Sequence, residues 1–311
     1  MIGTNNTLEE KREKLFTLFQ KYERKVYLFE KYRGPGFISK IKRALFAPQI
    51  YFPYLLVKVK MISRLKNSII ESKSMFGKKV QGLVSDREFI RMFPKLNDIQ
   101  EIKTAEFLIK NLKSNDVFYD IGANYGFFSL LAAEFITNGE IHCFEPIPEV
   151  FECLKYNLLN SKTSAKLFIN KLAVSNISGE IEFYFNRQVS GISNLFQNTE
   201  IGVEDKIKVT SVKLNDYFKN HNKPTIIKVD VEGAESLVIE GGFEFFSNNN
   251  PIIAMEVSSG EKGKKFSMKA VNKLYELGYK SYQIKQGGAI KPVLIYIDRI
   301  TGEFENFIFK K

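Results

Sequence analysis

Charged residues and glycines gather at two places in the sequence where they could do chemistry. The first is DIGANYG, from Asp120 to Gly126, which follows the apolar run VFY. Glycines let the backbone turn sharply and approach a ligand closely. The second is KVDVE, in which Lys228, Asp230 and Glu232 alternate with valines. Alternate side chains of an extended backbone point to the same side, so we expect these three charges to face one space.

The spacing of the first cluster indicates which kind of ligand it would hold. Gly122 and Gly126 read G-x-x-x-G, whereas a dinucleotide loop reads G-x-G-x-x-G. Glu145 ends the next apolar run, nineteen residues after Gly126. An acidic residue there can accept hydrogen bonds from both hydroxyls of a ribose. The pattern predicts a site for a nucleoside-containing ligand rather than an ordinary turn with an incidental Glu.

The second cluster would be costly to bury without a use. A strand inside a parallel sheet is normally apolar almost throughout, and burying unused charges destabilises a fold. We therefore favour a functional role for Lys228, Asp230 and Glu232 over a salt bridge at the sheet edge. Glu256 ends the apolar run PIIAME and could converge on the same place.

Alternating strands and helices must position these clusters. From residue 116 onward the sequence predicts a mostly parallel, doubly wound α/β sheet, whose strands carry ligands at their carboxyl ends. The expected strands are 117–120, 140–144, 166–174, 225–230 and 251–257, with helices at 127–135, 149–160 and 234–240. Segments 180–186 and 206–213 should form an antiparallel insertion, and 293–298 with 306–310 a C-terminal antiparallel hairpin.

The N-terminal part of the chain differs in charge from the rest. Residues 1–81 contain 18 Lys or Arg and 6 Asp or Glu. The remaining residues contain 28 Lys or Arg and 29 Asp or Glu. Apolar spacing predicts helices at 8–32 and 99–112, with a strand-like stretch at 80–93. We expect a basic, mainly helical segment over 1–75 and a second domain over 76–311, with its core from about residue 99. Because that domain is nearly neutral, we expect no nucleic-acid partner.

Two roles are open for the basic segment. Leu45, Phe46, Ile50, Tyr51, Leu55 and Leu56, with flanking lysines, could meet anionic lipid at a membrane surface. A helical subdomain or a self-association element is slightly favoured, because Pro48 and Pro53 break the amphipathic pattern.

The start of the chain and the cysteine count indicate a compartment. The start MIGTNNTLEEKREK is polar where a secretory signal would be apolar. Two cysteines are too few for a disulfide framework. We therefore expect a cytoplasmic protein, with peripheral membrane contact as the open alternative.

The clusters belong to a longer pattern that resembles a known family. The matching runs are DIGANYGFFSLLAAE, FEPIPEVFECLKYNLLN, KLAVSNISGE, SGISNLF, VTSVKLNDYF, IIKVDVEGAESLVIEGG and PIIAMEV. In this order and spacing, across about residues 99–311, they are similar to the FkbM family of S-adenosylmethionine-dependent methyltransferases. Ser211 departs from the more hydrophobic start usual for its region. The resemblance implies a class I methyltransferase fold, which is Rossmann-like, with the basic helical segment added in front.

The resemblance also implies roles for the residues of the first cluster. By similarity, Asp120, Gly122, Asn124 and Gly126 would hold the methionine part of S-adenosylmethionine and Glu145 its ribose. The segment 172–174, which includes Ala173, would flank the adenine. Ala123 and Pro146 complete the expected cofactor-binding set.

Family members typically methylate oxygen, often a hydroxyl of a sugar. The resemblance therefore implies a carbohydrate O-methyltransferase whose acceptor is a glycan, a glycolipid or a glycosylated metabolite. Asp230 or Glu232 is the candidate base for the hydroxyl proton. Lys228 would orient the acceptor or keep a carboxylate ionised, and Glu256 is a further candidate. A divalent cation held by Asp230 and Glu232 is the alternative to this metal-free arrangement.

Acceptor recognition is expected in the loop 190–198. Ser193 and Asn194 are the candidate polar contacts, and a solvated hairpin tip is the alternative for this loop.

Two other classes of function compete with methyl transfer. A nucleotide-cofactor oxidoreductase or epimerase is disfavoured by the glycine spacing and by the lack of a Tyr-x-x-x-Lys pair after the cofactor half. A non-catalytic binding module would use the basic N-terminal segment to contact nucleic acid or another protein.

Overall fold

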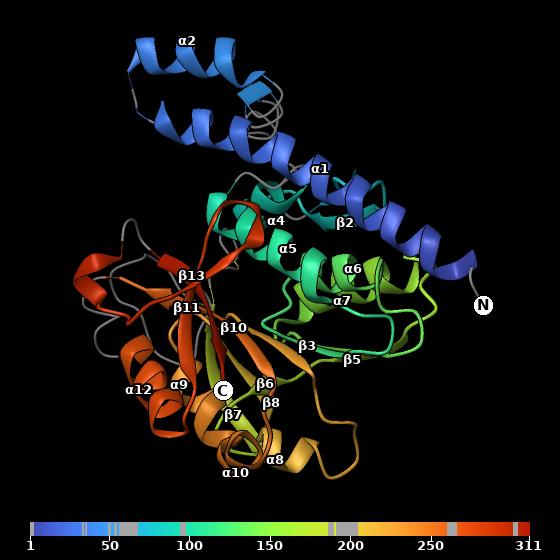
Figure 1. Cartoon of the computed structure of the whole chain (residues 1–311), viewed down its shortest axis with the longest axis vertical. Helices are drawn as coiled ribbons and strands as arrows, with labels where there is room; N and C mark the ends of the chain where they lie inside the picture. The colour runs from blue at the N-terminus through green and yellow to red at the C-terminus, as the bar shows by residue number, and fades with distance from the viewer. Residues whose placement is uncertain are drawn as a thin grey trace.

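The computed structural model describes residues 3–32, 34, 36–48, 51–52, 55, 68–93, 98–185, 190, 205–259, 266–300 and 304–311. Within them, a central eight-stranded sheet has helices on both faces (Figure 1). Its parallel strands are β3 (Val117–Ile121), β4 (Glu140–Phe144), β5 (Lys166–Asn170), β9 (Ile226–Val229) and β10 (Ile252–Ser258). Antiparallel strands β11 (Lys280–Ile284), β12 (Ile290–Pro292) and β13 (Phe304–Lys310) complete it.

The strand order places a ligand crevice at one point of the sheet. The order is β12-β11-β13-β10-β9-β3-β4-β5, so the chain first winds outward from β3 to β5 and later returns to pair β9 with the other side of β3. Ligands of doubly wound sheets bind where the winding direction changes, outside the carboxyl ends of the strands. Here that point lies between β3 and β9, the strands that lead into the two clusters.

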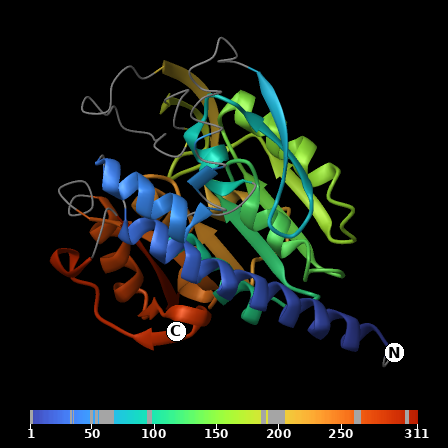
Figure 2. The ribbon, with the colours of Figure 1, turned by 90° about the horizontal axis from the view of Figure 1, so that it is seen from above.

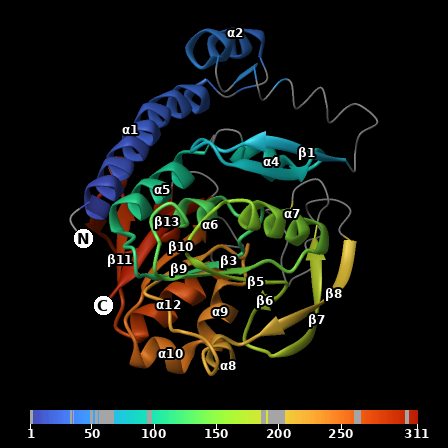
Figure 3. The same cartoon turned by 90° about the vertical axis from the view of Figure 1, so that its right-hand side faces the viewer.

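Helices cover the sheet in two layers, each with its own apolar core (Figure 3). One layer contains α5 (Ile99–Asn111), α6 (Phe127–Ala132) and α7 (Pro148–Leu159). The other contains α8 (Leu214–Tyr217), α9 (Glu235–Gly241), α10 (Phe243–Asn248) and α12 (Met268–Glu276). Burial on both faces explains why these strands are almost continuously apolar.

Two smaller sheets lie beside the central one. The expected insertion forms β7 (Gly179–Phe185) and β8 (Asp205–Val212), which are antiparallel, with β6 (Ala173–Val174) parallel to β8. A hairpin of β1 (Ile69–Lys73) and β2 (Lys79–Leu83) precedes α4 (Arg87–Met92). The buried Asn157 of α7 fixes this hairpin, because its side chain accepts a hydrogen bond from the Gln81 amide at 2.6 Å and donates to the Gln81 carbonyl at 3.0 Å.

Three predicted elements differ in the structure. Residues 80–93 form a strand only as far as Leu83, because Asp86 then accepts a hydrogen bond from the Glu88 amide and caps α4. Residues 166–174 divide into β5 and β6, which belong to different sheets. Residues 293–298 are not a strand; they lead into a 3-10 turn at Ile297–Arg299, and β11 and β12 form the hairpin instead, around a second such turn at Gln286–Gly288. β13 is paired on both sides, by β10 and β11.

The basic segment packs on the body along its first helix. The long helix α1 (Gly3–Lys31) crosses the outside of α5 (Figure 2). Its apolar residues, including Leu15, Phe19 and Val26, are buried in the same core as α5. The expected boundary at residue 75 falls in the turn between β1 and β2. α2 (Phe37–Phe46) follows α1 in the chain. None of the described helices is both long and apolar enough to cross a membrane.

Gly122 allows β3 and β9 to meet at the crevice. Its φ is +80°, and a Cβ atom there would lie 1.8 Å from the carbonyl oxygen of Asp230. The Asp230 amide also donates to the Ile121 carbonyl at 3.0 Å, which holds the two strand ends together. Only glycine combines this positive φ with so close an approach.

We expect Gly122→Ala to lower the free energy of unfolding by about 3 kcal/mol, because it adds an overpacking cost to the cost of a positive φ. Gly77→Ala is the matched control: φ is +85° there, but nothing lies within 4 Å of the added atom. Its expected cost is about 1 kcal/mol. Urea denaturation of both variants measures the difference, and equal losses would contradict the steric argument.

Candidate functional site

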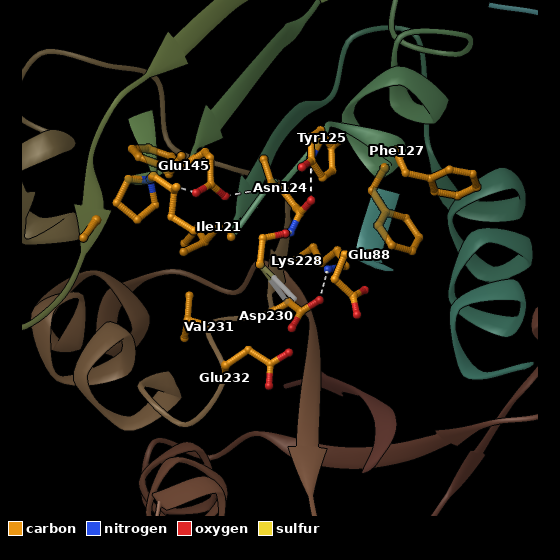
Figure 4. Close-up of a pocket in the computed structure, with 18 of the residues that line it drawn as sticks. Glu88, Ile121, Asn124, Tyr125, Phe127, Glu145, Lys228, Asp230, Val231 and Glu232 are labelled. Atoms are coloured by element: carbon orange, nitrogen blue, oxygen red, sulfur yellow. Dashed lines mark hydrogen bonds and ion pairs between the residues drawn. The ribbon is translucent and has the colours of Figure 1, made fainter. Parts of the chain in front are cut away.

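One cavity joins the two sequence clusters at the carboxyl ends of β3 and β9. It encloses about 900 Å³, counting space open to solvent. Among the expected residues, its lining includes Gly122, Ala123, Asn124, Glu145, Pro146, Ala173, Lys228, Asp230 and Glu232. Figure 4 shows Glu145 on one side of the Asn124 loop, with Lys228, Asp230 and Glu232 on the other. The expected cofactor and catalytic residues therefore share one space.

Glu145 holds the glycine loop in place. Its carboxylate accepts hydrogen bonds from the Asn124 amide at 3.0 Å and from the Ile147 amide at 2.9 Å. Burial raises the pKa of Glu145 to about 7. The two backbone hydrogen bonds lower this pKa, but their effect is smaller than that of burial. Each carboxylate oxygen can accept a further hydrogen bond, so Glu145 can both order the loop and bind a ribose.

Lys228 and Asp230 form an ion pair inside the cavity. The Lys228 ammonium lies 2.7 Å from a carboxylate oxygen of Asp230 and 4.7 Å from the centre of the Phe128 ring. Burial disfavours the Lys228 charge, but nearby carboxylates, above all Asp230 and Glu101, raise its pKa above the usual value. Lys228 is therefore a permanent cation that keeps a negative charge close by.

Glu232 reaches the cavity from a strained turn rather than from the strand. β9 ends at Val229, and Glu232 has a φ of +52°, which is uncommon for a residue other than glycine. Burial, and then the charges of Asp230 and Glu88, raise its pKa well above the usual value for a carboxyl group. The Glu232 carboxyl group therefore keeps its proton to a higher pH than an ordinary glutamate does.

The N-terminal half of the chain supplies three charged residues to the cavity that the sequence reasoning missed. They are Glu88 and Arg91 of α4 and Glu101 of α5. Arg91 is paired with Glu88 at 2.8 Å and with Asp98 at 3.2 Å. Burial raises the pKa of Glu101 to about 7, although Lys228 and Arg91 oppose this. For Glu88 and Arg91 the signal in the sequence was the acidic N-cap Asp86 followed by charges at helical spacing, within a segment interpreted as a strand. Glu101 lay in a segment correctly predicted as a helix.

Three expected residues lie close to the cavity without lining it. Asp120 is buried, accepts a hydrogen bond from the Ser129 hydroxyl at 2.5 Å and has one oxygen without a hydrogen-bond partner among the described residues. Gly126 has a φ of +86° and packs against Leu154 of α7. Glu256 is buried in β10. Asp120 and Gly126 thus shape the loop without lining the cavity, and Glu256 places a carboxylate oxygen within 4.8 Å of Asp230.

The expected acceptor loop is described at one position. Ser190 lines the cavity, and its hydroxyl accepts a hydrogen bond from the Asn124 side-chain amide at 2.9 Å. Its own amide donates to the buried Asp86 at 3.1 Å, and Asp86 also accepts from the Tyr125 hydroxyl. This anchors the insertion to the glycine loop. Ser193 and Asn194 lie outside the described residues.

A different set of carboxylates from the expected pair converges closely enough to hold a metal ion. In the described part of the chain, oxygens of Glu101, Asp230 and Glu256 lie within 4.8 Å of one another, whereas Glu232 is not in this group. Lys228 already places a positive charge beside Asp230.

The cavity fits a nucleoside cofactor that carries a positive charge. Apolar side chains line the end near Glu145, among them Phe144, Leu172 and Val174, and suit an adenine ring. At the other end, four carboxylic residues (Glu88, Glu101, Asp230 and Glu232) outnumber Lys228 and Arg91. A sulfonium centre complements this acidic end.

Solved structures show only weak similarity to the chain. The methyltransferase FkbM from Methylobacillus flagellatus is 10% identical, with a TM-score of 0.43, and the match covers 87% of this chain and 60% of that one. A SAM-dependent O-methyltransferase from Thermotoga maritima is 13% identical, with a TM-score of 0.38, over 79% and 78% of the two chains. Both scores are too low to support an argument about function.

Sequence comparison gives the clearer result. Hexuronic acid methyltransferase AglP of Haloferax volcanii is 22% identical over 169 residues, covering 53% of this chain and 66% of the relative. The 31-O-demethyl-FK506 methyltransferase FkbM of Streptomyces tacrolimicus is 26% identical over 159 residues, covering 42% and 60%. The matches thus span less than two thirds of these relatives.

A family model described as the methyltransferase FkbM domain matches residues 120–281. That range begins at the first residue of the glycine loop and contains the whole Lys228–Glu232 cluster. Since it covers more than half of the chain, the protein belongs to the FkbM methyltransferase family.

Proposed function

We propose that the protein is an S-adenosylmethionine-dependent O-methyltransferase that acts on a hydroxyl of a sugar-containing acceptor. One observation carries the proposal: the glycine loop with Glu145 and the Lys228–Asp230 ion pair line the same cavity. Donor site and proton acceptor are thereby adjacent. The name of the AglP relative, a hexuronic acid methyltransferase, supports a sugar as acceptor.

Alignment and proton removal are the tasks left to the protein. The bound cofactor would supply an activated methyl group that a nucleophilic oxygen can attack. A sugar hydroxyl is a weak nucleophile, so a positioned base must take its proton as the attack develops. Asp230 is the proposed base, because its carboxylate lines the cavity and is held in place by the Lys228 ammonium at 2.7 Å.

The other acidic groups of the cavity suit a sugar acceptor. Glu88 and Glu232 line the cavity on the same side of the loop as Asp230 (Figure 4). Carboxyl groups form strong hydrogen bonds with hydroxyls, and a sugar offers several hydroxyls on one ring. Glu232 in its protonated form would donate a hydrogen bond to a neighbouring oxygen of the acceptor.

The cofactor would lie along the glycine loop. Gly122, Ala123 and Asn124 would contact its methionine part, Glu145 and Pro146 its ribose, and Ala173 its adenine. Asp120 and Gly126 would position this loop rather than contact the cofactor directly.

A methyl-transfer screen tests the proposal. Protein and radiolabelled S-adenosylmethionine are incubated with glycan and glycolipid extracts, and we expect label in a sugar-containing product that is stable to alkali, as an ether is. Calorimetry should show binding of S-adenosylhomocysteine and no binding of NAD. Binding of NAD in its place would instead support an oxidoreductase or epimerase.

The base is tested by Asp230→Asn. We expect kcat to fall by roughly 100-fold or more, because the amide cannot accept the hydroxyl proton. Binding of S-adenosylhomocysteine should change little, which separates loss of the base from loss of the fold. Asp216→Asn is the matched control, because Asp216 is paired with Lys219 at 2.7 Å on α8, outside the cavity. A rate within threefold of wild type would remove Asp230 from the mechanism.

Glu232 is tested by its pH dependence. Its raised pKa keeps it neutral to a higher pH than an ordinary carboxyl group, and ionisation above this pKa abolishes its hydrogen-bond donor. Wild-type activity should therefore fall as the pH rises through this pKa. Glu232→Gln mimics the neutral form, so it should retain activity within about tenfold at pH 7 and lack the alkaline fall. If this variant is as impaired as Asp230→Asn, Glu232 is the base.

Metal removal tests the alternative in which carboxylates of the cavity hold a divalent cation. The Lys228 ammonium already contacts Asp230, and a divalent cation bound there would face its repulsion. We expect dialysis against EDTA to leave kcat within twofold, and added Mg²⁺ or Mn²⁺ to leave it unchanged. A loss that either cation restores would support a metal held by Glu101, Asp230 and Glu256.

A further inference from the structure

The second helix of the chain has its apolar side exposed. Phe37, Ile38 and Leu45 of α2 are 78%, 68% and 69% exposed, and Ile41 is 42% exposed. Positions 37, 38, 41 and 45 lie on one face of a helix. Figures 1 and 3 show α2 at the outer end of the molecule, beyond α1. An apolar face of this kind on a protein surface marks a binding site for a partner.

Arg43 lies on the side of α2 that faces the protein. Arg43 is 8% exposed, and its guanidinium donates a hydrogen bond to the Gly34 carbonyl at 3.0 Å. The same group lies 5.5 Å from the Phe29 ring of α1 and 5.2 Å from the Tyr51 ring. These contacts fix the rotation of the helix about its axis. The exposed face is thus a consequence of how α2 packs.

Positive charge surrounds this apolar face. Residues 21–46 include eight Lys or Arg and two Glu. Lys21, Arg24, Lys31, Lys40 and Lys42 are exposed. Both acids point toward the body: Glu23 is 4% exposed, and Glu30 accepts a hydrogen bond from the Ile99 amide at 3.2 Å. The outer surface of residues 21–46 therefore combines exposed apolar side chains with exposed lysines and an exposed arginine.

The combination of apolar and positively charged side chains distinguishes between a second copy of the chain and an anionic membrane as the partner of this face. In a symmetric dimer the same patch meets itself, so the lysines of one copy would lie opposite those of the other. An anionic bilayer accepts the apolar side chains and attracts the lysines at the same time. The charge pattern thus favours lipid over a second copy.

We propose that α2 binds the surface of anionic membranes as an interfacial helix. Phe37, Ile38, Ile41 and Leu45 enter the boundary between headgroups and acyl chains, and Lys40 and Lys42 lie at the level of the phosphates. This face shares Leu45 with the one expected from the sequence, and the expected Phe46 is 52% exposed, but the other expected residues do not belong to it. Tyr51 is 7% exposed and faces Arg43, Leu55 is half-buried, and Ile50 and Leu56 lie outside the described residues.

Co-sedimentation of the full chain with vesicles tests the proposal. The vesicles contain phosphatidylcholine alone or mixed with phosphatidylserine, and we expect binding to the mixed vesicles that weakens as salt is added. Ile41→Glu/Leu45→Glu should lower the partition coefficient at least about tenfold, because two apolar side chains no longer enter the bilayer. Lys40→Gln/Lys42→Gln should lower it about thirtyfold on mixed vesicles and little on neutral ones.

The matched control is Leu159→Glu/Leu294→Glu. These leucines are 63% and 64% exposed and belong to other parts of the body, so the variant should pellet like wild type. Equal thermal unfolding of all variants shows that the fold is kept, since every changed side chain is exposed. Light scattering without lipid measures self-association.

Three results would overturn the proposal. The first is equal pelleting of Ile41→Glu/Leu45→Glu and wild type. The second is no pelleting of wild type with either vesicle. The third is a dimer that Ile41→Glu/Leu45→Glu dissociates while vesicle binding is absent, which would assign the face to a second copy of the chain.

Discussion

The close contact between the ends of β3 and β9 determines the geometry of the site. Gly122 lies against the carbonyl of Asp230, and the Asp230 amide donates to the Ile121 carbonyl at 3.0 Å. The loop that would hold the cofactor and the residue that would take the proton are therefore joined through their backbones. Side-chain positions in the cavity follow from this contact, because neither strand end can shift without the other.

Charge is the second constraint on this cavity. A group of carboxylic acids surrounds two cations, Lys228 and Arg91, in a place with little water. Such a group is stable only if some of the acids are neutral or if a cationic ligand is present. The raised pKa values of Glu101 and Glu232 correspond to the first solution, and a sulfonium ligand would provide the second. The same electrostatics that make the empty cavity costly would favour the charged donor over its neutral product.

The basic N-terminal segment is divided between two tasks. α1 buries one face, including Phe19 and Val26, against the core that also contains α5. α5 and the neighbouring α4 supply Glu101, Glu88 and Arg91 to the cavity. α1 thus supports the site by packing on α5. α2, in contrast, turns its apolar side outward.

The sequence by itself determined the mostly parallel sheet and the placement of Gly122, Glu145, Lys228 and Asp230 near the carboxyl ends of its strands, because apolar periodicity and residue spacing are local properties. Only the tertiary structure decided which charges join them. Glu88 and Glu101 are more than 100 residues from Asp230 in the chain, and the edge order of β11, β12 and β13 depends on pairing between distant strands. The outward rotation of α2 likewise depends on where Arg43 finds its partners, Phe29 and Tyr51. Contacts of this kind arise when the chain packs, and no local pattern encodes them.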